Sequence, residues 1–165
     1  MQHTAEYWIE ALKLQEHPEG GYYRITYESR DAISDRELSV SFEGRRFLAT
    51  SIYFLLDNGQ VSRFHRLIAD ELWYYHAGNP VNIFCIERDG KLVIKKLGLN
   101  LHEGERPQVL VPGGTIFGSA PDGCGYSLAG CMVTPGFDFE DFELLSREDL
   151  LRQYPQYKRI IYRLT

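Results

Sequence analysis

Residues 59–78, which read GQVSRFHRLIADELWYYHAG, are the stretch that decides the fold. A glycine stands at each end, with His65 and Glu71 between. Histidine is the side chain whose ordinary pKa of about 6.5 suits proton transfer near neutral pH. A carboxylate at a fixed spacing from it suggests a polar site held on regular structure.

The second half of this stretch predicts a strand over residues 72–76, because it is rich in aromatic β formers. Side chains alternate between the two faces of a strand. If Glu71 faces the interior, Trp73 and Tyr75 face it too, and His76 points outward.

Similar short runs lie on both sides. We expect strands at residues 22–27, 47–56, 72–76, 81–88, 91–97, 108–111, 115–117 and 126–133. Asp89-Gly90 predicts a hairpin between the expected strands 81–88 and 91–97. Many short strands separated by Gly-rich turns indicate a sandwich or a barrel.

The two ends of the chain predict helices. Thr4 is a candidate N-cap for an amphipathic helix over residues 4–14, and the Pro and Gly residues at 17–21 end it. Ser146 begins a capping-box-like sequence, and Pro155 suits the first turn of a last helix. The predicted fold is mainly β, a single domain over residues 1–165 with short helices at both termini.

Composition excludes several classes of protein. The chain has 165 residues, 13% of them aromatic, which excludes disorder and requires an aromatic core or an aromatic pocket. The net charge of −5 gives no basic surface for nucleic acid. No apolar run approaches the roughly 20 residues that span a membrane, and the N-terminus lacks the basic region of a signal peptide.

The three cysteines, Cys85, Cys124 and Cys131, are odd in number and lack CxxC spacing. We interpret them as reduced thiols and predict a cytoplasmic protein.

The opening stretch resembles the first cupin motif. Gly59, His65, Glu71 and Gly78 are in register with it, but Leu67 stands where the second His is expected. Residues 112–117, PGGTIF, resemble the second motif, with Phe117 in place of its His.

The resemblance extends over residues ~12–145 to the cupin-5-like family of small proteins. It is carried by the blocks HPEGGYYRIT from residue 17, IYFLL from 52, SRFHR from 62, DELW from 70, QVLVP from 108 and GCMVTPGFDFEDFE from 130. It implies a double-stranded β-helix, the cupin jelly-roll barrel, usually paired as a homodimer, and no established reaction. The family is also similar in fold to non-metal sugar epimerases, which use a His inside the barrel.

The residues at the motif positions argue against a metal. Cupin metal sites generally gather three His and one Glu, and here Leu67 and Phe117 replace two of the ligands. His65 and Glu71 alone make a weak site, so we expect no metal and no other cofactor. His17 remains a possible substitute ligand, whereas strand parity argues against His76.

We predict that His65 is a general base, that Glu71 is the carboxylate that orients it, and that Tyr75 is a general acid. The alternative is that His65 and Glu71 have structural roles only. His65 would then be a core histidine hydrogen-bonded to Glu71 or backbone, and Glu71 a rim carboxylate paired with Arg63 or Arg66.

Binding roles are assigned to residues expected near the barrel centre or mouth. The candidate substrate-binding residues are Trp73, Phe117, Tyr53, Ser51, Arg24 and Glu19. Trp73 can stack on a planar or sugar ligand, and Arg24 can bind a carboxylate or phosphate. The alternative for residues 17–24 is a structural loop into the first strand. We interpret the aromatic–acidic run 136–143 as packing at the barrel exit.

These observations predict a protein that binds a small polar or carbohydrate-like molecule in its barrel, as a metal-independent isomerase or epimerase. The alternative is a non-catalytic module that holds a small ligand between aromatic side chains. A homodimer is expected in either case, with neither nucleic acid nor membrane as a partner.

Overall fold

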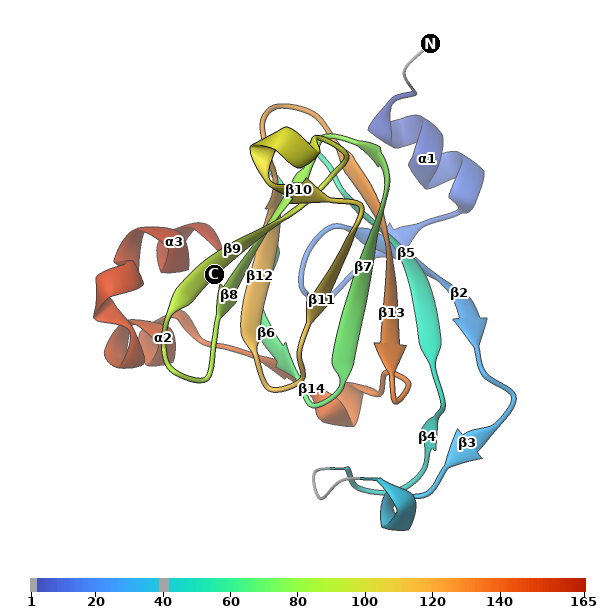
Figure 1. The fold of residues 1–165 in the computed structure, drawn as a ribbon. Coiled ribbons are helices and arrows are strands. Elements are labelled where there is room, and N and C mark those ends of the chain that lie inside the picture. Colours follow the sequence, from blue (N-terminus) through green and yellow to red (C-terminus); the bar gives the residue numbers. More distant parts are fainter. Residues whose placement is uncertain (1–2, 39–41) are drawn as a thin grey trace.

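Two six-stranded sheets form the body of the protein, whose computed structural model describes residues 3–38 and 42–165 (Figure 1). The first sheet has the order β1-β2-β5-β13-β7-β11. Its strands are β1 (Gln15–Glu16), β2 (Tyr22–Glu28), β5 (Thr50–Leu56), β7 (Asp70–Gly78), β11 (Gln108–Val111) and β13 (Ser127–Thr134).

The second sheet has the order β10-β9-β8-β12-β6-β14. Its strands are β6 (Ser62–Leu67), β8 (Val81–Ile86), β9 (Leu92–Leu97), β10 (Glu105–Arg106), β12 (Ile116–Pro121) and β14 (Phe142–Leu144). A separate pair, β3 (Ala32–Ile33) and β4 (Arg46–Phe47), extends from one end of the barrel (Figure 1).

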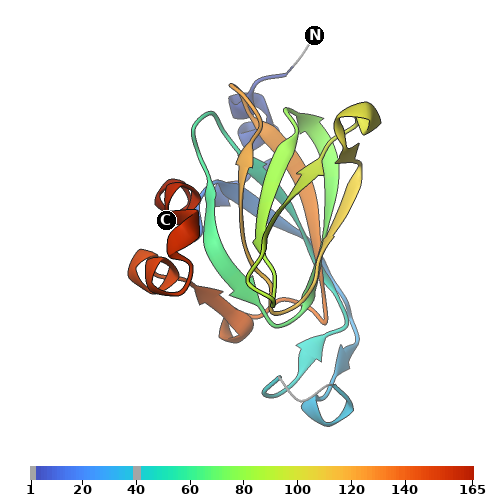
Figure 2. The ribbon, with the colours of Figure 1, turned by 60° about the vertical axis from the view of Figure 1, so that its left-hand side comes forward.

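The outer face of the first sheet is covered by the N-terminal helix and that of the second by the C-terminal helices (Figure 2), while the remaining helices are single 3-10 turns in loops. The helices are α1 (Ala5–Leu12), η1 (Asp35–Glu37), η2 (Leu101–Glu103), η3 (Phe139–Asp141), α2 (Arg147–Gln153), η4 (Pro155–Tyr157) and α3 (Lys158–Arg163). Thr4 caps α1 by accepting a hydrogen bond from Tyr7 N, and Ser146 caps α2 by accepting one from Asp149 N. No helix in the described part of the chain is long and apolar enough to cross a membrane.

Strands distant in sequence alternate within each sheet, so the fold is the predicted jelly-roll with short terminal helices. β13 pairs with both β5 and β7, and β12 pairs with both β6 and β8. The Asp89-Gly90 hairpin is confirmed, because β8 and β9 are antiparallel and Gly90 has a φ of +83°.

Two strand predictions differ from the structure. The predicted strand 47–56 is divided into β4 and β5, because Leu48 N and Ala49 N turn away to donate to Ser29 Oγ. β6 was not predicted as a strand at all, yet it carries His65. Its outward residue Phe64 is fully buried beneath Leu150 and Ile161 of the C-terminal helices, so the strand lacks the usual apolar–polar alternation.

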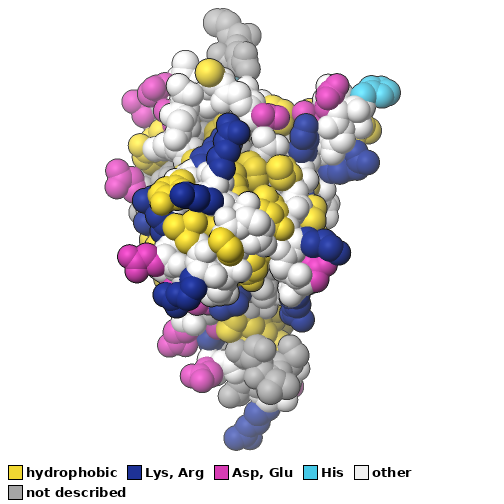
Figure 3. Space-filling view, turned by 90° about the vertical axis from the view of Figure 1, so that its left-hand side faces the viewer, with side chains coloured by type: hydrophobic (Ala, Val, Ile, Leu, Met, Phe, Trp, Pro, Cys, Tyr) yellow, Lys and Arg dark blue, Asp and Glu magenta, His cyan; other side chains and the backbone are white. Residues whose placement is uncertain are grey.

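The interior between the sheets is filled by one apolar cluster, which includes Phe54, Trp73, Phe117 and Cys131. Side chains of α1 pack on the outside of the first sheet. On the face toward the C-terminal helices, basic, acidic and hydrophobic side chains are interspersed (Figure 3).

Candidate functional site

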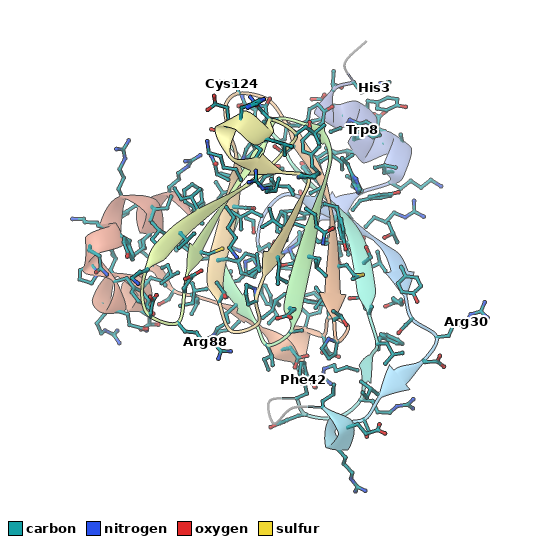
Figure 4. All side chains as sticks on the ribbon, in the orientation of Figure 1. His3, Trp8, Arg30, Phe42, Arg88 and Cys124 are labelled. Carbon is teal, nitrogen blue, oxygen red and sulfur yellow. The ribbon has the colours of Figure 1, made fainter. Side chains whose placement is uncertain are left out.

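A cavity of about 290 Å³ lies inside the barrel at the end where β4 and η3 lie. Its inner part is polar and contains His17, Glu19, His65 and Glu71. Its mouth carries exposed or half-buried residues, among them Glu28, Phe47, Phe137, Asp138 and Phe139. Phe42, which packs against the interior cluster, lies at this same end in Figure 4, whereas Trp8 and Cys124 lie at the other.

His65 faces this cavity from β6 and is 2% exposed. Its Nδ1 lies 2.7 Å from the carbonyl oxygen of Arg63 and 3.1 Å from Oε2 of Glu19. Because a carbonyl oxygen only accepts, Nδ1 carries the proton in the neutral ring and Nε2 holds the lone pair. Burial lowers the pKa of His65, opposed by the hydrogen bond to Arg63 and by the charge of Glu71, so the ring is neutral at pH 7.

Glu19 reaches His65 from the loop that precedes β2. Ser62 Oγ donates to its Oε1 at 2.9 Å, and Arg63 N donates to its carbonyl oxygen at 2.9 Å, which joins the loop to β6. Burial raises the pKa of Glu19 to about 8, although the Ser62 hydrogen bond and Arg63 oppose the rise.

Glu71 lies on β7 and is 7% exposed. Its Oε2 is buried without a hydrogen-bond partner among the described residues. Burial raises the pKa of Glu71 to about 7, with the nearby His65 lowering it and Glu19 adding to the rise. The alternative interpretation, in which Glu71 pairs with Arg63 or Arg66, does not match the structure: Arg66 binds Glu143, and Arg63 donates to carbonyl oxygens of the loop before β2.

His17 is the second imidazole of the cavity, and its side chain is 8% exposed. Its Nδ1 accepts from Glu19 N at 3.3 Å, and its ring stands edge-on to Tyr23 and Phe54. Burial, with His65 adding to it, lowers the pKa of His17 to about 4. Both imidazoles are therefore neutral near pH 7.

Trp73 lines the cavity as expected from strand parity, and its Nε1 is buried without a partner in the described residues. Phe117 does not line the cavity. It packs against His65, with its ring centroid 4.1 Å from that of the imidazole, and so helps to fix the position of the His65 ring.

Besides Phe117, three predicted site residues lie outside the cavity lining, which corrects their expected positions. Tyr75 faces the interior but lies further along β7, where its hydroxyl donates to Gly78 O at 2.6 Å. Tyr53 is on the outer face of β5, because Ile52 and Phe54 are the inward residues. Arg24 is exposed and donates to Leu12 O at the end of α1.

The remaining predicted residue, Ser51, is among the lining residues, although its hydroxyl donates to Cys131 O at 3.0 Å. Cys131 itself lines the cavity, and burial raises the pKa of its thiol well above 9. The thiol stays protonated and is not a nucleophile at neutral pH.

The sequence interpretation missed the mouth of the cavity. Phe137, Asp138, Phe139 and Phe142 line it, whereas we had interpreted the run 136–143 as packing alone. The alternation of aromatic and acidic residues in this run could have indicated the mouth, but the same pattern is also typical of a segment that packs against the end of the barrel.

The cavity does not fit the metal site that cupins generally carry. Leu67 and Phe117 offer no donor atoms, and His65 already uses Nδ1 for Arg63 and Glu19. In residues 3–38 and 42–165, no three His, Cys, Asp or Glu side chains gather as a metal-binding group. What remains is two neutral imidazoles, His17 and His65, and two buried carboxyls, Glu19 and Glu71, a set of groups for proton transfer.

The comparisons with known proteins agree with this fold. The family described as Cupin superfamily (DUF985) matches residues 6–145. Protein SO0799 from Shewanella oneidensis superimposes with a TM-score of 0.90 at 51% identity, over 99% of this chain and 98% of that one. A hypothetical protein from Leishmania major gives 0.89 at 39% identity, over 99% of both chains. The uncharacterized yeast protein YML079W (Saccharomyces cerevisiae) is 30% identical over 155 residues, covering 87% of this chain and 76% of its own.

Proposed function

The chain belongs to the DUF985 family of the cupin superfamily, and from that premise we propose that its cavity binds a small polar or carbohydrate-like molecule and isomerises or epimerises it without a metal. The observation that carries the proposal is a neutral, buried His65 whose Nε2 makes no hydrogen bond to the other described residues, in a cavity that also contains the buried carboxyl of Glu71, whose pKa is raised to about 7.

His65 acts as the base in this proposal. Its Nε2 removes a proton from the carbon next to a substrate carbonyl, and the proton on Nδ1 stays shared with Arg63 O and Glu19. The imidazolium that forms is stabilised by Glu19. This gives Glu19 the orienting role that the sequence interpretation had assigned to Glu71.

Glu71 is the matching acid. With a pKa of about 7 it is protonated in a large share of molecules at neutral pH. It donates its proton to the carbonyl oxygen as the C–H electrons form the enol. The imidazolium of His65 then returns a proton to carbon while the Glu71 carboxylate takes one from an enol hydroxyl, which re-forms the carbonyl, restores both residues and completes the isomerisation or epimerisation. Tyr75 is not assigned this role, since its hydroxyl is bonded to Gly78 O and it lies outside the cavity lining.

The test is exchange of substrate α-hydrogens in deuterated water, followed by NMR with glucose, fructose, glucosamine and dihydroxyacetone as probes. We expect exchange with at least one probe and a loss of about 10²–10⁴-fold in His65→Gln, the range for a general base. His76→Gln is the matched control, because His76 is exposed on the outer face of β7 against Gly130. Equal rates in wild type and His65→Gln would refute the assignment.

The second candidate is a module that binds such a ligand without chemistry. It is favoured by the aromatic and apolar share of the lining, which includes Phe54, Trp73 and Phe142. Mass spectrometry under native and then denaturing conditions identifies any retained molecule. A retained ligand whose α-hydrogens do not exchange would support this candidate over catalysis.

We further propose that the protein works as a cytoplasmic homodimer. The three cysteines are free, in keeping with a reducing compartment. Ile25 and Tyr27 on β2 are about half exposed and would be covered by a second copy. Light scattering of the purified protein at micromolar concentration tests this, and a monomer would overturn it.

A further inference from the structure

All charged side chains that line the cavity are acidic. They are Glu19, Glu28, Glu71 and Asp138, and no Lys or Arg of the described residues lines it. The chain holds 18 Lys and Arg, so basic residues are plentiful but point elsewhere. A ligand with a carboxylate or phosphate would meet only like charge or uncharged groups here.

The mouth has the composition of a site for an organic cation. Glu28 is exposed and has no hydrogen bond or ion pair with other described residues. Asp138 also lines the mouth, and its two neighbours in the chain, Phe137 and Phe139, contact each other with ring centroids 5.0 Å apart; Phe139 is 57% exposed. Aromatic faces attract ammonium groups, and a nearby carboxylate adds to that attraction.

Arg46, next to Phe47 on β4, does not reverse this charge. Its guanidinium is buried and donates to both oxygens of Asp141, at 2.7 and 2.9 Å. It is also within 3.3 Å of Glu140. The cation is thus already paired with Asp141 and Glu140 and is not among the lining residues, although its charge also reaches Asp138.

The inner end suits an uncharged group that carries oxygen. His17 and His65 are neutral near pH 7, so no positive group there can pair with an anion. Two buried polar atoms on the wall have no partner in the described residues, Glu71 Oε2 and Trp73 Nε1. An unsatisfied buried polar atom costs about 1–3 kcal/mol, which a ligand hydroxyl can relieve.

We propose that the cavity selects a small molecule with a protonated amine, held at the mouth by Glu28, Asp138 and the surrounding phenylalanines, and with uncharged hydroxyl or carbonyl groups at the inner end. Carboxylates and phosphates are rejected. This inference rests on the proposed function in so far as both use the same cavity. A volume of about 290 Å³ limits the ligand to a single small ring or its open-chain equivalent.

Three sugars of equal ring size test the charge preference: glucosamine, glucose and glucuronate. Isothermal titration calorimetry at pH 7 should give glucosamine an affinity about tenfold above that of glucose, as expected for exposed carboxylate and aromatic contacts to one ammonium. Glucuronate should bind more weakly than glucose. Raising NaCl from 50 to 500 mM should weaken glucosamine alone.

The double variant Glu28→Gln/Asp138→Asn should bring the affinity for glucosamine down to that for glucose and leave the affinity for glucose unchanged. The amide of Asn can still accept from Glu140 N, as Asp138 does, so the cap of η3 is kept. Glu148→Gln on α2, which is exposed and not a cavity residue, is the matched control. Melting temperatures of all variants verify folding.

Glucuronate binding as tightly as glucosamine, an unchanged preference in the double variant, or no glucosamine binding would each overturn the inference. Its failure is distinguishable from failure of the proposed function. Glucosamine binding without hydrogen exchange would refute the proposed catalysis and support the preference for an amine. Hydrogen exchange on neutral or anionic probes, without preferential binding of the amine, would support the catalysis and refute the preference.

Discussion

Glu19 decides which nitrogen of His65 is available to a ligand. Its Oε2 and the Arg63 carbonyl oxygen both lie on the Nδ1 side, so the lone pair is confined to Nε2. Glu19 also affects the basicity of His65, because its own pKa of about 8 means that it becomes negatively charged just above neutral pH. An ionised carboxylate beside Nδ1 stabilises the imidazolium and so strengthens the base.

This coupling predicts the pH profile of Glu19→Gln. In the wild type the rate of α-hydrogen exchange should fall above about pH 7 as the acid Glu71 loses its proton, and the ionisation of Glu19 near pH 8 should offset part of this fall by strengthening the base. In the variant the amide oxygen still accepts from Nδ1 but cannot ionise, so the fall should be steeper and the rate at pH 9 should be about tenfold below that of the wild type.

The measurement is the exchange rate at intervals from pH 6 to 9.5, with glucosamine concentration varied to separate kcat from KM. Glu143→Gln serves as the control, because Glu143 pairs with Arg66 on the surface. A variant profile that runs parallel to that of the wild type above pH 8 would show that Glu19 does not act on the base.

At the scale of elements, the loop of residues 17–21 is fixed against β6 by its glycines. Gly20 has a φ of +112°, and a Cβ placed there would lie 2.2 Å from Val61 O. Only glycine permits that approach, and it sets the position of Glu19 one residue earlier. The loop is therefore part of the site and not only a path into β2.

Gly20→Ala and Gly59→Ala form a matched pair that tests this. Gly59 also has a positive φ, +78°, but a Cβ there meets nothing within 4 Å. We expect about 1–2 kcal/mol lost in Gly59→Ala from backbone strain alone, and roughly 3 kcal/mol or more in Gly20→Ala from strain plus the clash with backbone. Urea unfolding measures both, and equal losses would contradict a tight loop.

Some of the helices and strands could be predicted from the sequence, and others could not. Strands with alternating apolar residues and turns marked by Asp-Gly were predictable, and so were Glu71 and Trp73 as inward residues of β7. β6 was not, because its outer face is covered by helices more than 80 residues later in the chain. The partner of His65 was not predictable either, since Glu19 lies 46 residues earlier and meets it only through the tertiary fold.

At the scale of the whole molecule, four buried titratable groups of the cavity set how stability depends on pH. Glu19 and Glu71 have raised pKa values of about 8 and about 7, against 4.5 in the unfolded chain. The pKa of His17 is lowered from 6.5 to about 4, and that of His65 is lowered as well. The carboxyls favour low pH and the imidazoles favour high pH, so the two effects oppose each other between about 4.5 and 6.5.

Above pH 6.5 the carboxyls outweigh the imidazoles, which finish titrating in the unfolded chain by about pH 7.5, and this gives the sign of the last prediction. The native state there binds more protons than the unfolded state, so the free energy of unfolding falls as pH rises. From pH 6.5 to 8.5 the net loss should be about 2 kcal/mol, and most of it should vanish in Glu19→Gln. Urea unfolding at half-unit pH steps measures the slope, with Glu143→Gln as the surface control. A free energy of unfolding that is constant or rises over this range would mean that the two carboxyls are not buried in their protonated form.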